Sequence, residues 1–142
     1  MKNHSLPAVL LFAVAAAAGC RALPEPVCES RLLVPAVQVT GPRTAAVGQT
    51  VTYTLRVRLG NSCGAFDSIV VSKDSSRISP FSQQVGVQGK YTGCSCQADT
   101  LTVTPVTYQF RPAKAGTYYL HFLSQQFLTR PSTFLNDTLT VR

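Results

Sequence analysis

The chain has 142 residues, of which 45% are hydrophobic and 13% are charged, and its 13 Lys and Arg against 6 Asp and Glu give a formal net charge of +7. This length suffices for one domain with a single core, and no stretch is apolar for long enough to form a transmembrane helix. The positive charge favours anionic neighbours such as phosphorylated glycolipids, acidic polysaccharides or nucleic acid.

The N-terminus has the pattern of a bacterial export signal. Lys2 precedes an apolar run from Leu6 to Ala18, which is shorter than the roughly 20 residues that span a bilayer. The run ends in Ala17-Ala18-Gly19-Cys20, which resembles the lipobox of bacterial lipoproteins. This resemblance implies that residues 1–19 are a signal peptide, that Cys20 is lipidated with palmitate, and that the mature chain is held at a membrane. The alternative is an ordinary signal peptide that ends at an unrelated cysteine.

The rest of the chain is predicted to be a short tether and an all-β domain. Residues 20–31 contain two prolines and no periodicity, so we expect a tether that leads into a domain of residues 32–142. The clearest strand is 49–59, where apolar residues alternate with threonine and arginine. Pro105 predicts an edge or bulged strand. The expected strands are 37–39, 49–59, 68–72, 83–88, 101–110, 116–123 and 135–141.

Seven short strands separated by turn residues predict a single antiparallel β-sandwich. Residues 114–118, Lys-Ala-Gly-Thr-Tyr, resemble the tyrosine corner of immunoglobulin-like domains, in which the tyrosine hydroxyl binds nearby backbone. Lys114 replaces the aspartate of that motif, and the chain has no Trp. The resemblance implies an immunoglobulin-like sandwich over residues 32–142, but a fold of this kind carries no function with it.

Four cysteines are predicted to lie at one end of the sandwich, because alternating strand directions bring their loops together. An exported chain is oxidised, so we expect two disulfides, in which Cys28 and Cys63 each bind one member of the Cys94-x-Cys96 pair. The alternatives are a thiolate site for a soft metal and a redox-active pair. Once residues 1–19 are removed, His121 is the only histidine available to complete a metal site, so we expect neither a metal nor a cofactor.

The acidic residues and the histidine do not form a catalytic pattern. Asp67, Asp99 and Asp137 each precede an expected strand, where aspartate commonly forms turns, and His121 is predicted to be a solvated strand residue. We therefore expect no enzyme. The triplets that begin at these aspartates, Asp-Ser/Thr-aliphatic, resemble the O-glycosylation acceptor motif of Bacteroidetes-type bacteria, although turns before strands give the same triplets.

The opposite end of the sandwich is predicted to be basic and to bind anions. Because the tether enters at the cysteine end, this basic pole would point away from the membrane. It is expected to hold Arg43, Lys73, Arg77, Arg111, Lys114 and Arg142, against Asp74 and the terminal carboxylate.

The expected function is a membrane-anchored, non-catalytic binding or envelope-assembly lipoprotein, in the outer rather than the inner membrane. Its expected partner is an anionic envelope polysaccharide or protein, and we expect no nucleic acid. One alternative is a small metal-handling or thiol-redox lipoprotein that uses Cys94 and Cys96. Another is a hydrolase inhibitor, which would need a protruding loop. Residues 125–133 are the candidate, with Phe127 and Leu128 at the tip unless these two residues close the end of the core.

Overall fold

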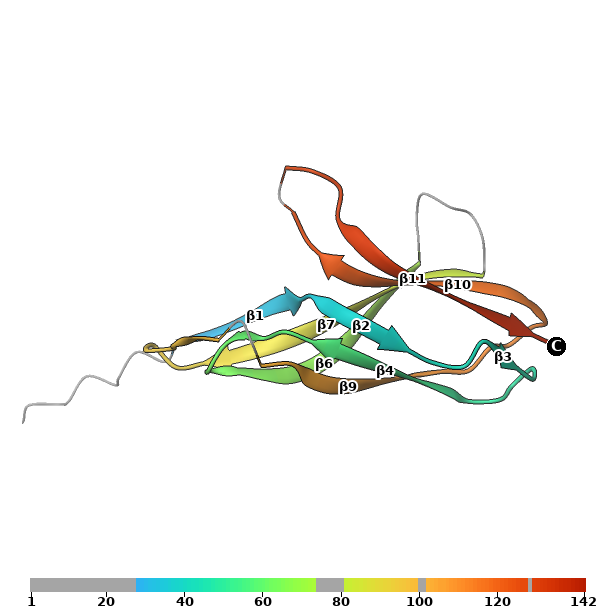
Figure 1. Cartoon of the computed structure of the whole chain (residues 1–142), viewed down its shortest axis with the longest axis horizontal. Helices are drawn as coiled ribbons and strands as arrows, with labels where there is room; N and C mark the ends of the chain where they lie inside the picture. The colour runs from blue at the N-terminus through green and yellow to red at the C-terminus, as the bar shows by residue number, and fades with distance from the viewer. Residues whose placement is uncertain (1–27, 74–80, 100–101, 128) are drawn as a thin grey trace, which may run out of the picture.

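The structure is a computed structural model that describes residues 28–73, 81–99, 102–127 and 129–142, and this part of the chain is all-β (Figure 1). Within these residues no helix is long and apolar enough to cross a membrane. The strands are β1 (Glu29–Val34), β2 (Ala36–Thr40), β3 (Thr44–Ala45), β4 (Val51–Val57), β5 (Gly60–Asn61), β6 (Gly64–Lys73), β7 (Ser82–Thr92), β8 (Ala98–Asp99), β9 (Thr104–Phe110), β10 (Gly116–Gln125) and β11 (Thr133–Val141).

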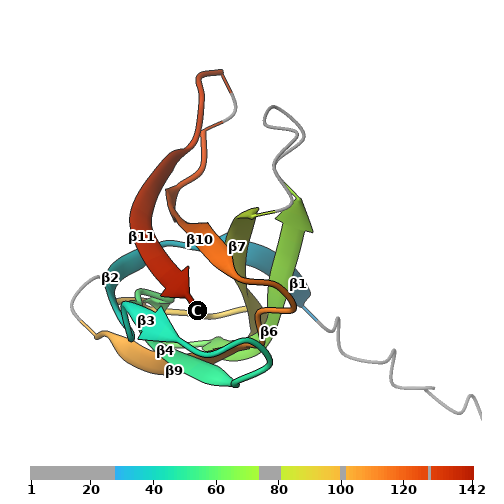
Figure 2. The same ribbon diagram turned by 90° about the vertical axis from the view of Figure 1, so that its right-hand side faces the viewer.

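Two curled sheets contain most of these strands (Figure 2). In the larger sheet, β7 pairs with β6 along one edge and with both β1 and β10 along the other edge. β10 pairs in turn with β11, and β11 with β3. The smaller sheet has the order β2-β4-β9. The expectation of a wholly antiparallel fold is wrong at two places, since β7 pairs with β10 and β3 with β11 in parallel. Between β7 and β10 the chain crosses to the smaller sheet through β9 and returns, so β10 runs in the same direction as β7.

Every second side chain is buried in the strands whose sequence alternates between apolar and polar residues, as the sequence predicts. In β4, Val51, Tyr53, Leu55 and Val57 are buried, while the residues between them are exposed. They form one cluster with buried residues of the larger sheet, and the rings of Tyr53 and Phe122 lie 5.6 Å apart between centroids. Burying a side chain of this size stabilises the fold by about 1.5–3 kcal/mol. This shared core holds the two sheets together.

Tyr118 has the hydrogen bonds of a tyrosine corner. Its hydroxyl donates to the Lys114 carbonyl oxygen at 3.0 Å and accepts from the Lys114 N–H at 3.2 Å. The ring of Phe81 packs edge-on against Tyr118 at 5.0 Å between centroids. Gly116 has a φ of 147°, and a Cβ there would lie 2.9 Å from the Phe81 ring, so only glycine fits the turn. The corner therefore fixes the start of β10 against the core.

The first strand differs from the sequence prediction. The expected tether is wrong for residues 29–31, because β1 begins at Glu29 and pairs with the end of β7. Five exposed residues precede the buried Val34 in β1, so the sequence has no alternation that would reveal a strand. After Pro35 the chain continues as β2 in the smaller sheet.

Two other local predictions can be compared with the structure. Pro105 lies in β9, which is an edge strand as expected. Asp67 and Asp137 do not precede strands, because Asp67 lies at a bulge inside β6 and Asp137 lies within β11. Thr100, the second residue of the triplet that begins at Asp99, falls outside the described residues.

Candidate functional site

The cysteine end is closed by two disulfides. Cys28 bonds Cys94 and Cys63 bonds Cys96, with Cα–Cα distances of 5.1 and 5.5 Å. This agrees with the expected pairing of Cys28 and Cys63 with the Cys94-x-Cys96 segment. The start of β1, which directly follows Cys28, lies at the end of the molecule opposite the C-terminus (Figure 1). The disulfides thus tie the beginning of β1 and the loop after β5 to the loop after β7.

In this oxidised form the cysteine end offers no thiolate for a metal or for redox chemistry, because all four sulfur atoms are in disulfides. Within the described ranges, no group of three or more His, Cys, Asp or Glu could hold a metal ion.

His121 is paired with an amide. Its Nδ1 lies 2.7 Å from Asn136 Oδ1, and its ring packs edge-on against Phe134. The prediction of a solvated histidine is wrong for Nε2, which is shielded from solvent and has no partner among the described residues. Among the described residues the hydrogen-bond partner of the ring is thus an amide and not a carboxylate.

Burial raises the pKa of three tyrosines. The pKa of Tyr53 rises from 10.0 to about 12, mainly through burial and then through the charge of Asp137. Burial also raises the pKa of Tyr91 and Tyr108. Their protonated hydroxyls are structural donors: Tyr53 donates to the Pro42 carbonyl, Tyr91 to the Leu59 carbonyl and Tyr108 to Gln83 Oε1. These shifts hold the tyrosines neutral and do not prepare them for acid–base chemistry at neutral pH.

The opposite end brings together four of the six predicted basic residues: Arg43, Arg111, Lys114 and Arg142. We call this set the basic end. Backbone hydrogen bonds join its chain segments: the Thr140 N–H donates to the Arg43 carbonyl, the Val47 N–H to the Arg142 carbonyl, the Arg142 N–H to the Ala45 carbonyl, and the Gly48 N–H to the Pro112 carbonyl.

The side chains of the basic end remain largely free to meet a partner. Arg43 is 80% exposed and lies 3.8 Å from Asp137, while Arg111 Nε donates to the Gly48 carbonyl oxygen at 2.7 Å. Lys114 and Arg142 are exposed and form no ion pair among the described residues. Four cations can therefore attract a distant anion from this end. Among the described residues Arg43 has an acidic side chain, Asp137, close to it, and the terminal carboxylate expected at this end offsets part of the positive charge.

The other two predicted members are not placed at this end. Lys73 ends β6, whose tip lies away from the C-terminus on the side from which the β10–β11 hairpin projects (Figures 1 and 2). Arg77 and Asp74 fall outside the described residues. The described basic end is therefore smaller than the predicted one.

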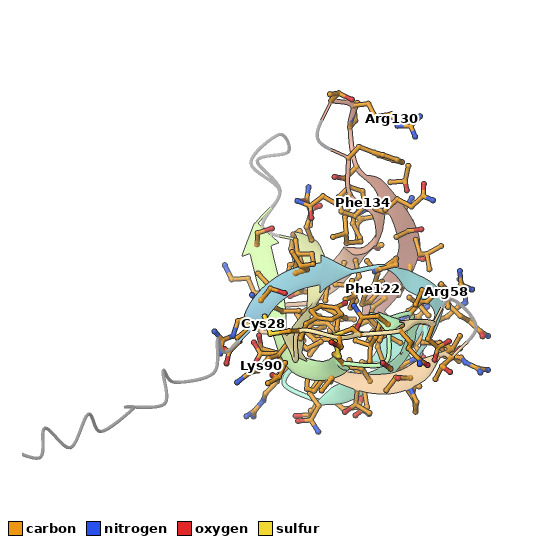
Figure 3. The ribbon with its side chains drawn as sticks, turned by 90° about the vertical axis from the view of Figure 1, so that its left-hand side faces the viewer. Cys28, Arg58, Lys90, Phe122, Arg130 and Phe134 are labelled. Carbon is orange, nitrogen blue, oxygen red and sulfur yellow. A yellow bond between two sulfur atoms is a disulfide. The ribbon has the colours of Figure 1, made fainter. Side chains whose placement is uncertain are left out.

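The β10–β11 hairpin forms an arm that stands off the sheets (Figures 1 and 3). We call residues 125–133 the hairpin arm. The guanidinium carbon of Arg130 lies 3.8 Å from the centroid of the Phe127 ring, which is a cation–π contact. Phe127 is not part of the core cluster, so the alternative in which it closes the end of the core is wrong, and Leu128 falls outside the described residues.

An uncharged groove lies between the hairpin arm and the body. It consists of two adjoining hollows of about 200 and 610 Å³ that share Leu33, Leu123 and Gln126. Phe134 lines the first hollow and Phe127 the second, and no charged residue lines either. This groove could not be predicted from the sequence, because its lining residues come from segments as far apart as Leu33 and Phe134.

The exposed face of the smaller sheet is a second surface that the sequence analysis did not single out. It has no acidic residue, since β2, β4 and β9 contain neither Asp nor Glu. The alternation of β4 was the available signal, because it places threonine and arginine together on the exposed side. We call this set the threonine–arginine face: Gln38, Thr40, Thr52, Thr54, Arg56, Arg58, Pro105, Thr107 and Gln109.

No protein-family model, no curated protein and no solved structure matches the chain. The function must therefore be inferred from the chemistry of the molecule's own surfaces.

Proposed function

We propose that this protein is a non-catalytic binding module, held at a bacterial envelope membrane by a lipid on Cys20, whose basic end binds an anionic partner. In this proposal the all-β domain is an immunoglobulin-like β-sandwich. The hydrogen bonds of the Tyr118 corner and the core shared by two facing sheets support that assignment.

The observation that carries the proposal is the chemical difference between the two ends. Cys28, where the described chain begins, lies at the disulfide-bonded end, and the four cations of the basic end lie at the other (Figure 1). Two disulfides are typical of a protein that folds in an oxidising compartment outside the cytoplasm, which is consistent with export. A chain anchored ahead of Cys28 presents its basic end away from the membrane, where it meets envelope polymers and proteins.

The pairing of the acidic residues supports a non-catalytic role. Glu29 pairs with Arg31 and Lys90, and Asp67 pairs with Arg31. Asp137 lies close to Arg43, and Asp99 Oδ1 accepts from the Thr102 N–H. A carboxylate engaged in this way is a poor candidate for a general base, which needs a nucleophile within hydrogen-bond reach.

A hydrolase inhibitor is the second candidate, and the hairpin arm favours it. The arm stands off the body and carries the Phe127–Arg130 pair, an aromatic and an arginine of the kind that dominate protein interfaces. Inhibition of a lysozyme or a serine protease by the full chain, abolished by Phe127→Ala, would support this candidate.

The proposed function is tested with two variants that each remove two cations. The end variant is Lys114→Gln with Arg142→Gln, and the matched control is Arg31→Gln with Lys90→Gln, at the disulfide end. Full-length proteins are immobilised and exposed to detergent-solubilised bacterial envelope at low salt and at about 0.15 M salt, where charges are screened beyond about 8 Å. We expect the parent and the control to retain anionic envelope material at low salt, and the end variant to retain less. Equal retention by all three proteins would contradict the proposal.

A further inference from the structure

We propose that the threonine–arginine face binds a linear acidic polysaccharide that lies along β4 and reaches the basic end. This inference rests on the proposed function, because it names the class of the anionic partner and extends the surface that holds it.

The face is an ordered array of polar side chains across three strands. Arg56 lies between Gln38 on β2 and Pro105 on β9, and Thr54 lies between Thr40 and Thr107. Thr52 forms the next rung with Gln109. All of these side chains are exposed. In β4 and β9 their neighbours along the strand mostly face the core, whereas in β2 the neighbouring Val37 is also exposed.

The array has the length to hold a chain molecule. Alternate residues of a strand are about 6.8 Å apart, so the row from Thr52 to Arg58 spans about 20 Å. Arg111 comes two residues after Gln109, just past the end of β9, and is exposed, so it continues the row toward the basic end. A linear polymer on this row therefore meets Arg58 and Arg56, then hydroxyl groups, then Arg111.

The charge of the face is positive and uncompensated. Among the described residues, Arg56 and Arg58 form no ion pair, whereas Arg31, Arg43 and Lys90 each have an acidic partner. The acids that the structure describes lie in β1, β6, β8 and β11. Guanidinium groups bind carboxylates and sulfates through paired hydrogen bonds, so the complementary ligand carries such groups at intervals.

The remaining side chains of the face favour a polysaccharide over other polyanions. Threonine hydroxyls and glutamine amides both donate and accept hydrogen bonds, as the hydroxyls of a sugar require. The face holds no aromatic residue on which the bases of a single-stranded nucleic acid could stack. It also lacks the aromatic anchor that commonly dominates a protein interface, and its apolar residues are Pro105 and, at the bulge of β2 beside Gln38, Val37, which is 40% exposed.

The test measures binding of the full-length protein to four polymers: polygalacturonate for carboxylate, dextran sulfate for sulfate, neutral dextran, and a single-stranded DNA oligonucleotide. The face variant is Arg56→Gln with Arg58→Gln, and it is compared with the end variant and the control defined above, since all three lose two cations. A second face variant, Thr54→Val with Thr107→Val, keeps every charge. We expect binding to one or both acidic polysaccharides, weakened about threefold to tenfold in the face variant and little changed in the control.

The outcomes separate the two proposals. If the end variant loses binding while the face variant matches the control and the threonine variant matches the parent, the face is not part of the site and the inference is overturned. If the parent binds neither acidic polysaccharide more tightly than neutral dextran, the inference also fails, and the proposed function then rests on retention of other anionic envelope material. Stronger binding of the DNA than of either acidic polysaccharide would overturn the choice of a polysaccharide. A loss of affinity in the threonine variant, with its melting temperature unchanged, would support sugar hydroxyls as the groups recognised.

Discussion

Replacing Tyr118 by phenylalanine removes one hydroxyl from the corner and leaves the ring packing in place. That hydroxyl makes two hydrogen bonds with the backbone of Lys114, at 3.0 and 3.2 Å. Its loss leaves a partly buried carbonyl and N–H without their partner, which costs about 1–2 kcal/mol. For a domain of this size, that cost lowers the melting temperature by about 3–10 °C.

The neighbouring tyrosine supplies the control. Tyr119 is 47% exposed, and its hydroxyl has no hydrogen-bond partner among the described residues. Tyr119→Phe should therefore leave the free energy of unfolding within about 0.5 kcal/mol of the parent value, with little change in melting temperature. Both variants are compared by thermal denaturation followed by circular dichroism under identical conditions. Equal melting temperatures for the two variants would refute the stabilising role assigned to the Tyr118 hydroxyl.

Three further results are expected. Cys63→Ala should free one thiol, at Cys96, and non-reducing peptide mapping should still find Cys28 linked to Cys94; a Cys28–Cys96 link would contradict the connectivity. Because the pKa of Tyr53 is raised in the folded state, its contribution to stability is complete below pH 10 and is lost as the pH rises toward 12. Chemical denaturation across this range should show a smaller decrease in stability for Tyr53→Phe than for the parent. Cys20→Ser should abolish partitioning into a detergent phase, and full partitioning would rule out the lipid anchor.

Strands with a regular pattern could be predicted from the sequence, because burial on one face leaves an alternation. The buried and exposed residues of β4 follow that pattern through all of its length. The strand β7 is harder to recognise, since its interior contains Gly86 and Gly89, which have no side chain to continue the pattern. Packing favours glycine most clearly at Gly89, where a Cβ would lie 2.9 Å from the buried Val34; a Cβ on Gly86 would lie 3.2 Å from the partly exposed Leu33. Packing against β1 thus removes from β7 the signal by which strands are predicted.

The candidate surfaces were predicted less completely than the strands. The disulfide-bonded end could be predicted because strand direction alone decides which loops meet. The position of Lys73 could not, because it depends on how far β6 extends and on the curl of the larger sheet. Predicting the threonine–arginine face requires knowing which strands are neighbours, because Gln38 and Pro105, which lie on either side of Arg56, belong to other strands.

The most direct test of the central claim, that the basic end binds an anionic partner, is the salt dependence of binding. The dissociation constant of the full-length protein for the acidic polysaccharide that the parent binds more tightly, polygalacturonate or dextran sulfate, is measured at several salt concentrations for the parent, the end variant and the control. Each cation that contacts the polymer adds about 0.7–0.9 to the slope of log Kd against log salt concentration, by analogy with nucleic acids. The account predicts a clearly smaller slope for the end variant than for the control, which should match the parent. Equal slopes for the end variant and the control would contradict it.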